Sequence, residues 1–194
     1  MTARRPRCLA RGTSAVDVRS VAYDRAVTIL RGTVVVLRLA TRDDIPALVT
    51  IRETPEVFEH WRGGADLQAA VEEDFAEEGS TNYVIELDGR VVGWIQWAAE
   101  EEPDYRHASI DIYVDPRVHG RGIGTDAVRT LARHLFDDHG HHRITIDPAA
   151  TNEAAIRCYT KVGFRPVGIT RQSERGNDGT WHDSLLMDLL AGEL

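Results

Sequence analysis

The feature that most restricts the fold of this chain is a glycine-rich segment that separates two regular apolar patterns. Residues 119–125 read His-Gly-Arg-Gly-Ile-Gly-Thr, after an apolar run over 108–114 and before apolar side chains at helical spacing over 125–136. Glycines let a backbone turn tightly and approach a ligand, and a helix N-terminus offers free N–H groups and a positive dipole end. The segment predicts a phosphate-binding turn between a strand and a helix, with a plain structural turn as the alternative.

The glycine spacing excludes two common nucleotide-binding loops. A nucleoside-triphosphate P-loop needs Gly-Lys-Ser or Gly-Lys-Thr, and the dinucleotide motif needs Gly-x-Gly-x-x-Gly. Residues 119–125 contain neither pattern. Any phosphate bound here is therefore expected to belong to a different kind of cofactor.

The rest of the chain predicts a mixed α/β domain. Helices are expected after the 41–44 loop, where Pro46 lies near the helix start, and near residues 67–75, 125–136 and 152–160. Asp88-Gly89 predicts a tight hairpin turn between two strands. The expected strands are residues 33–39, 83–87, 91–98, 108–114, 144–147, 164–170 and 185–190. This order, an antiparallel meander followed by a βα crossover, is typical of an α/β (α+β) fold.

Length and charge predict one domain with a basic extension. A chain of 194 residues, 42% of them hydrophobic, suits a single core. Residues 1–31 hold seven arginines and two aspartates, a net charge of +5; because the whole chain carries −8, the remainder carries about −13. We expect residues 1–32 to be a flexible, dispensable extension and residues 33–194 to be the domain.

The acidic balance and the cysteine content restrict location and partners. An acidic domain repels nucleic acid and anionic lipid and attracts cationic solutes, although it is also a common solubility device. The chain has no secretory signal pattern and no apolar stretch near the ~20 residues of a membrane helix. Cys8 and Cys158 are the only cysteines, too few for a disulfide scaffold. We expect a cytoplasmic protein that binds neither nucleic acid nor membrane.

Two motifs together resemble a known family. Residues 119–124 are similar to the cofactor motif of the Gcn5-related N-acetyltransferases (GNAT), which reads Arg or Gln, two residues, Gly, one residue, Gly or Ala. Gly122 and Gly124 fill the glycine positions, and His119 stands where the family usually has Arg or Gln. Residues 151–164, which end in Tyr-Thr-Lys-Val-Gly-Phe, are similar to the second hallmark of the family.

This resemblance covers about residues 33–190 and implies a fold and a cosubstrate. The implied GNAT fold is a mixed, mostly antiparallel twisted sheet flanked by helices. Acetyl-CoA would lie in the cleft between splayed central strands, and no metal would be needed. The residues that the resemblance implies for cofactor binding are Ile112, Val114, His119, Gly120, Arg121, Gly122, Ile123, Gly124, Thr125 and Asn152.

Shorter segments resemble the aminoglycoside 6′-N-acetyltransferases. They are Glu59-His60-Trp61-Arg62-Gly63-Gly64, Gly93-Trp94-Ile95-Gln96, Ile110-Asp111, and Asp147-Pro148 with Asn152 and residues 155–159. This second resemblance implies acetylation of the 6′-amino group of an aminoglycoside, and hence antibiotic resistance. Its implied substrate-binding residues are Trp61, Gln96, Asp111 and Asp147.

Two residues have the chemistry for catalysis once the family is considered. Acetyl transfer needs a neutral amine and a protonated thiolate leaving group. The resemblance makes Asp111 the general base and Tyr159 the general acid. The alternatives are an Asp111 that faces solvent between Ile110 and Ile112, and a Tyr159 that is a packed helix aromatic. Asn152 suits a helix N-cap as well as a cofactor contact.

Other candidates favour a structural interpretation. The acidic run at 100–104 is expected to be a solvated loop, and Trp97 and Tyr105 to be packing residues unless they line the acceptor site. The histidines at 139, 141 and 142 indicate a surface loop rather than a metal site.

The substrate alternatives are a peptide N-terminus, a protein lysine, a polyamine or a small metabolite amine. A non-catalytic CoA-binding module is a further alternative. We expect a monomer or a homodimer.

Overall fold

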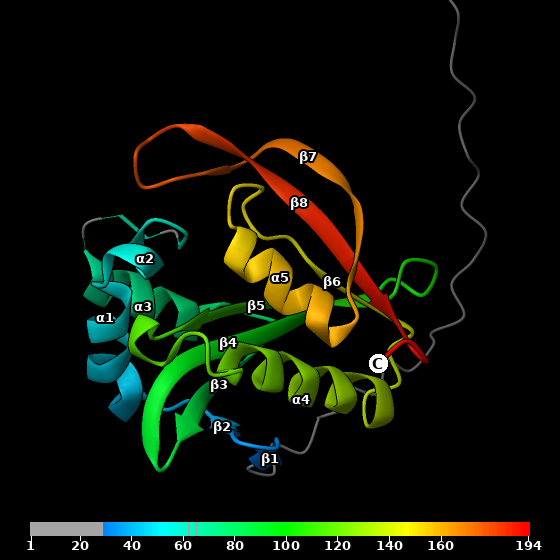
Figure 1. Cartoon of the computed structure of the whole chain (residues 1–194), viewed down its shortest axis with the longest axis horizontal. Helices are drawn as coiled ribbons and strands as arrows, with labels where there is room; N and C mark the ends of the chain where they lie inside the picture. Colours follow the sequence, from blue (N-terminus) through cyan, green and yellow to red (C-terminus); the bar gives the residue numbers. More distant parts are fainter. Residues whose placement is uncertain (1–28, 62, 65) are drawn as a thin grey trace, which may run out of the picture.

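A single eight-stranded sheet organises the molecule in the computed structural model, which describes residues 29–61, 63–64 and 66–194 (Figure 1). The spatial order is β1-β2-β3-β4-β5-β6-β8-β7, and β5–β6 is the one parallel pair among the described strands. The strands are β1 (Ile29–Arg31), β2 (Val36–Leu39), β3 (Ser80–Leu87), β4 (Arg90–Glu100), β5 (His107–Val114), β6 (Arg143–Ile146), β7 (Arg165–Arg175) and β8 (Trp181–Leu190). The prediction of a mixed, mostly antiparallel sheet flanked by helices is confirmed.

The helices cover both faces of this sheet. They are η1 (Arg42–Asp44), α1 (Ile45–Arg52), α2 (Pro55–Phe58), α3 (Leu67–Ala76), η2 (Pro116–Val118), α4 (Ile123–Asp137) and α5 (Glu153–Val162). Pro46 lies in the first turn of α1, as expected. No helix within the described ranges is long and apolar enough to cross a bilayer.

Side-chain alternation divides the core into two layers. On β3, Tyr83 and Ile85 pack in the cluster that includes α4, whereas Val84 between them packs in the cluster that includes α1 and α3. Successive strand side chains point to opposite faces, so each strand serves both layers. Helices α4 and α5 therefore cover one face and α1 and α3 the other.

The β3–β4 hairpin has the turn that the sequence predicted. Asp88 and Gly89 have φ angles of 51° and 73°, both in the left-handed region. Two positive φ angles give the twist that joins adjacent antiparallel strands directly. This hairpin places β4 beside β5 at the centre of the sheet.

The domain begins earlier than expected. Ile29–Arg31 pair with residues 36–38, so the expected boundary at residue 33 is wrong. The Asp126 carboxylate of α4 accepts hydrogen bonds from the backbone of Thr33, Val34 and Val35 at 3.0, 2.8 and 3.1 Å, which holds the β1–β2 turn against the helix. The expectation of a flexible extension covered residues 1–32, of which residues 1–28 lie outside the described residues.

The parallel strand pair separates after two residues. Ala108 and Ser109 pair with Ile144 and Thr145, whereas β4 follows β5 as far as Val114. Beyond Ser109, no strand of the described residues pairs with the edge of β5 that faces β6. The sheet therefore opens into a cleft at its centre.

The last two strands form a hairpin that crosses this cleft. In Figure 1 the β7–β8 hairpin, coloured orange to red, extends past α5 toward α2. The first half of β8 is held by backbone hydrogen bonds from the Leu185 amide to Pro148 O and from the Ala150 amide to Asp183 O, both 2.8 Å. The hairpin and α2 thus face each other at one end of the cleft.

Candidate functional site

A cleft of about 800 Å³ lies where β5 and β6 separate. Its walls are the second half of β5, the glycine-rich turn, the start of α4, α5, the end of β6, the segment after α2, and the β7–β8 hairpin. The two sequence motifs, more than 20 residues apart, meet across this cleft. The cleft has one arm beside the glycine-rich turn and α5, and a second arm beside α2 and the hairpin.

The glycine-rich turn has the backbone that only glycine adopts easily. Gly120 and Gly122 have φ angles of 72° and 80°, and a Cβ at either position would meet no atom within 4 Å. The open space beside them, together with the free N–H groups at the start of α4, suits a phosphate group. Gly124 is different, because its Cβ would lie 3.4 Å from Cys158 Sγ. That position keeps α4 and α5 close together.

The free edge of β5 directs peptide groups into the cleft. The carbonyl of Val114 accepts a hydrogen bond of 2.8 Å from His119 Nε2, while the next amide, that of Asp115, pairs with β4 through Val92. Because peptide groups alternate along a strand, the N–H groups of Val114 and Ile112 face the cleft. These groups can hold the amides of a pantetheine arm and polarise a thioester carbonyl.

His119 and Arg121, which were both expected to bind the cofactor, lie differently relative to the cleft. His119 lines the cleft, and its ring donates a hydrogen bond to the Val114 carbonyl at the end of β5, which holds the turn against that strand. Arg121 is exposed and does not line the cleft. Arg157 and Lys161 of α5 do line it, and they place positive charge on the arm that the glycine-rich turn forms. An anionic, phosphate-bearing cosubstrate such as CoA fits this arm.

Asp111 lies in the middle of β5, half-buried in the wall of the cleft. Its Oδ2 accepts a hydrogen bond of 3.1 Å from Gln96 Nε2. Gln96 Oε1 in turn accepts from Trp94 Nε1 at 3.4 Å. Gln96 is only 4% exposed and is not among the residues that line the cleft, and its predicted contact with the substrate stays a prediction. Gln96 orients Asp111 from behind.

Tyr159 reaches the cleft from α5 and remains a phenol. Burial raises its pKa, and the nearby Cys158, Asp111 and Asp147 raise it further. A protonated hydroxyl can donate a hydrogen bond or a proton to a developing anion. At the start of the same helix, Asn152 lines the cleft and accepts from the Ala155 amide at 3.1 Å, so it is an N-cap as expected.

The second arm of the cleft is acidic and aromatic. Trp61 packs edge-on against Tyr113 with ring centroids 4.8 Å apart, and the buried Arg52 guanidinium lies 5.9 Å from the Trp61 ring. The carboxylates that line the cleft here are those of Glu56, Asp111, Asp147 and Glu174. A cationic ligand suits this arm by charge.

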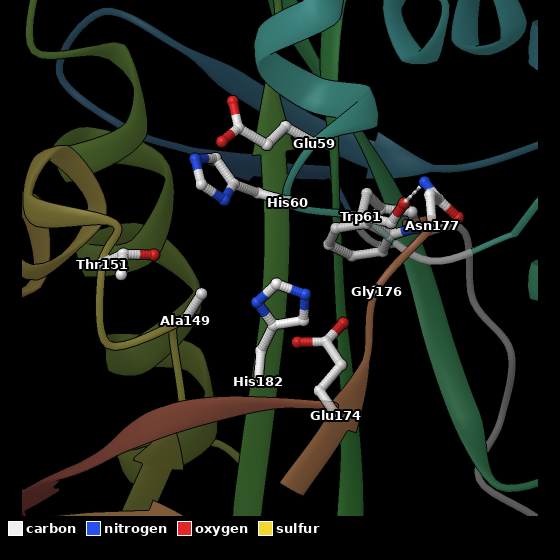
Figure 2. Close-up of a pocket in the computed structure, with 9 residues that line it drawn as sticks. All are labelled: Glu59, His60, Trp61, Ala149, Thr151, Glu174, Gly176, Asn177 and His182. Carbon is white, nitrogen blue, oxygen red and sulfur yellow. Dashed lines mark hydrogen bonds between the residues drawn. The ribbon is translucent and has the colours of Figure 1, made fainter. Parts of the chain in front are cut away.

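A small cavity of about 60 Å³ adjoins this acidic arm (Figure 2). Glu59 and His60 reach it from the segment after α2, and Glu174 and His182 reach it from the β7–β8 hairpin on the opposite side. Trp61 and Glu174 line both this cavity and the main cleft. The cavity extends the acidic arm between α2 and the hairpin.

The remaining candidates from the sequence, two aromatic residues, a histidine cluster and an acidic run, lie outside the lining of the cleft. Trp97 is buried with its ring 4.6 Å from that of His139 and 5.8 Å from that of His141, and it does not line the cleft. His141 is itself only 3% exposed, so the expected surface loop is wrong for this histidine. Tyr105 and the acidic run at 100–104 are exposed and do not line the cleft.

The sequence did not identify the contribution of the β7–β8 hairpin. Glu174 and Trp181 line the cleft from it, and Glu56 lines it from α2. These residues lie in no recognisable motif, because the chain folds back over the site from a distant segment. Arg157 and Lys161 sit inside the second motif, and their i,i+4 spacing, which puts both on one face of the helix, could have identified them.

Comparisons with known proteins agree with this geometry. The model of the acetyltransferase (GNAT) family matches residues 47–164. The type 1 aminoglycoside N(6′)-acetyltransferase of Klebsiella pneumoniae is 33% identical over 154 residues, which are 69% of this chain and 75% of that protein.

Solved structures with the same fold include complexes with the cosubstrate. The structure of AAC(6′)-Ib in complex with paromomycin and acetyl-CoA aligns with a TM-score of 0.68 and 31% identity over 81% of this chain and 93% of that chain. The structure of Mycobacterium smegmatis RimJ in complex with CoA-disulfide aligns with a TM-score of 0.74 and 27% identity over 87% and 88% of the two chains. The family match over residues 47–164 and the 33% identity to the Klebsiella enzyme show that this chain belongs to the GNAT family and is an acetyl-CoA-dependent N-acetyltransferase.

Proposed function

We propose that the protein transfers the acetyl group of acetyl-CoA to the 6′-amino group of an aminoglycoside antibiotic, in the cytoplasm, and so confers resistance to it. The observation that carries this proposal is the division of charge in the cleft. Arg157 and Lys161 lie on the cofactor arm, whereas on the other arm four carboxylates outnumber one arginine: Glu56, Asp111, Asp147 and Glu174 against Arg175. An acceptor with several ammonium groups matches several carboxylates, and the 33% identity to an aminoglycoside N(6′)-acetyltransferase supports the same choice.

In this proposal Asp111 prepares the amine. Aliphatic amines are cationic near neutral pH and must lose a proton before they attack a carbonyl. Asp111 accepts that proton, directly or through a water, while the hydrogen bond from Gln96 holds its carboxylate in place. The N–H groups of Ile112 and Val114 stabilise the oxyanion that forms as the amine nitrogen bonds to the acetyl carbon.

Tyr159 completes the transfer by assisting the leaving group. As the carbon–sulfur bond breaks, its hydroxyl donates to the departing thiolate, since the raised pKa of Tyr159 keeps the phenol protonated. A thiol with a pKa of about 8.5 is already a good leaving group. Loss of the hydroxyl in Tyr159→Phe is therefore expected to slow turnover rather than abolish it.

Asp147 and Trp61 hold the acceptor in this proposal. Asp147 follows β6 at the mouth of the cleft and pairs with an ammonium group, and the Trp61 ring forms the wall beside it. Neither role requires proton transfer. These two residues therefore set affinity for the acceptor rather than the rate of the chemical step.

A panel of amines tests the substrate class. The protein is incubated with acetyl-CoA and either kanamycin, spermidine, a peptide with a free N-terminus, or an N-blocked peptide that contains lysine, and free thiol is measured over time. The proposal predicts thiol release that is fastest with kanamycin. Release that is fastest with another amine would reassign the acceptor, and CoA binding without release from any amine would indicate a non-catalytic module.

A further inference from the structure

The β7–β8 hairpin is attached to the segment after α2 through one side chain. Asn177 Nδ2 donates to the carbonyls of Phe58 at 2.6 Å and Trp61 at 2.9 Å, and Asn177 Oδ1 accepts from the Gly64 amide at 3.0 Å. Figure 2 shows the Asn177 amide directed at the backbone of Trp61. Among the described residues, these are the side-chain hydrogen bonds that join the hairpin tip to residues 58–64.

The tip that carries Asn177 is itself well ordered by hydrogen bonds. The Gly176 amide donates to Thr180 O and the Gly179 amide to Gly176 O, both at 2.9 Å. Asp178 accepts from the Thr180 amide at 2.9 Å and lies 3.0 Å from His182 Nε2. The turn thus presents Asn177 in a fixed direction, so loss of its side chain removes the attachment without removing the turn.

The two segments that Asn177 joins form opposite walls of the acidic arm. Trp61 comes from one wall and Glu174 from the other, and both line the cleft and the small cavity beside it. The first half of β8 is anchored separately, through Asp183 and Leu185, on Ala150 and Pro148 after β6. With the tip also fastened, the hairpin spans the arm from end to end.

We propose that Asn177 is a positioning residue for the acceptor: it fastens the β7–β8 hairpin to the segment after α2 and keeps the acidic arm in the shape that binds the amine. This inference rests on the proposed function, because it assumes that the amine occupies that arm. A site that is assembled for only part of the time binds its ligand more weakly in proportion to that fraction. The glycine-rich turn lies at the other arm, so affinity for CoA does not depend on Asn177.

Two substitutions separate the contacts that Asn177 makes. Asn177→Ala removes all three hydrogen bonds. Asn177→Asp keeps an acceptor for the Gly64 amide but places a carboxylate oxygen against the carbonyls of Phe58 and Trp61. Thr170→Val is the matched control. It removes hydrogen bonds of 3.1 Å to Ser184 O and 3.4 Å to Ser173 Oγ within the same hairpin, whereas Thr170 itself does not line the cleft and makes no hydrogen bond to the described residues between 58 and 64.

The expected result is a selective loss of acceptor affinity. Given net hydrogen-bond contributions of this kind, both Asn177 variants should raise KM for the acceptor roughly tenfold, with kcat and the Kd for CoA changed less than about twofold. Thr170→Val should match the wild type. Exchange of the Gly64 amide with solvent deuterium should accelerate in Asn177→Ala, which reports the attachment without any substrate.

Three outcomes would overturn the inference. An unchanged acceptor KM in Asn177→Ala, a wild-type KM in Asn177→Asp, or a parallel loss of CoA affinity would each show that the attachment does not set the acceptor arm. Failure of the proposed function is seen separately, in the wild-type protein, as an absence of thiol release with every amine. Exchange at Gly64 that is equally slow in both proteins would show that Asn177 does not hold the hairpin at all.

Discussion

Asp111 and Asp147 have different surroundings, although both line the same cleft. Asp111 is half-buried in the middle of β5 and bound by Gln96, whereas Asp147 is exposed at the end of β6. Both are close enough to Tyr159 to raise its pKa. A half-buried, oriented carboxylate suits proton transfer, and an exposed one suits attraction of a cation.

The first prediction separates these two roles. Asp111→Asn should lower kcat by about 10²- to 10⁴-fold, because the amine loses its general base. Asp147→Asn should mainly raise KM for a cationic acceptor. Steady-state kinetics of both variants with one aminoglycoside provide the check, and near-wild-type turnover in Asp111→Asn would remove this residue from the mechanism.

Asp126 gives a prediction about stability and pH. Burial opposes its ionisation, but hydrogen bonds from the backbone of Val34, Thr33 and Val35 outweigh that effect and lower its pKa. A carboxyl with a lower pKa in the folded protein stabilises it above the ordinary aspartate value of about 3.9. That contribution is lost as pH falls through the lower, folded value.

Urea unfolding at several pH values tests this effect. Asp126→Asn should reduce the free energy of unfolding by roughly 1–2 kcal/mol at pH 7, and the difference from wild type should shrink at acid pH. Asp104→Asn, in an exposed loop, is the control. A difference that stays constant down to the acid transition would contradict the proposed role of the charge.

At the scale of elements, the glycine-rich turn before α4 needs glycine for two reasons: its backbone has a positive φ, and the proposed cofactor needs the space beside it. Gly122→Val would strain a residue whose φ is 80° and would fill the space beside the helix N-terminus. Gly140→Val is a matched control, because Gly140 has a φ of 64° and open space around it but lies beyond the far end of α4. Both variants force valine into a positive φ, but only Gly122→Val places a side chain in the cleft.

Calorimetric titration with CoA distinguishes the two glycines. Gly122→Val should bind CoA at least about tenfold more weakly than Gly140→Val, with both proteins folded by circular dichroism. Equal CoA affinity in the two variants would mean that the glycine-rich turn does not contact the cofactor.

The elements that the sequence predicted are those with strong local signals. The Asp88-Gly89 hairpin, the helix after the glycine-rich turn and the Asn152 N-cap were all identifiable, because turn chemistry and apolar periodicity act over a few residues. Strand β1 was missed because it has three residues and depends on pairing with β2. The role of the β7–β8 hairpin was missed because contacts such as Asn177 with Phe58 join residues 119 positions apart.

At the scale of the whole molecule, the complete sequence carries an excess of acidic charge, and the acceptor arm of the cleft has the same sign. The chain has a formal net charge of −8, and several carboxylates gather on the acceptor arm. Long-range attraction between exposed charges is screened by salt, whereas proton transfer between groups in contact is much less affected.

Salt should therefore act on binding before it acts on turnover. Raising the ionic strength from about 0.01 M to 0.5 M is expected to raise KM for an aminoglycoside several-fold with little change in kcat. A neutral hydroxylamine acceptor, assayed in parallel, should show no such rise. A salt-independent aminoglycoside KM would show that charge on the acceptor arm does not guide the substrate.

Neomycin and paromomycin differ in whether position 6′ carries an amino or a hydroxyl group, which makes them the most direct test of the proposed reaction. With acetyl-CoA and the purified protein, the account predicts that one neomycin product carries its acetyl group on the 6′ nitrogen, identified by mass and NMR spectra. Paromomycin should bind as a competitive inhibitor and release no thiol. Acetylation of paromomycin at another amine, or no acetylation of neomycin, would contradict the account.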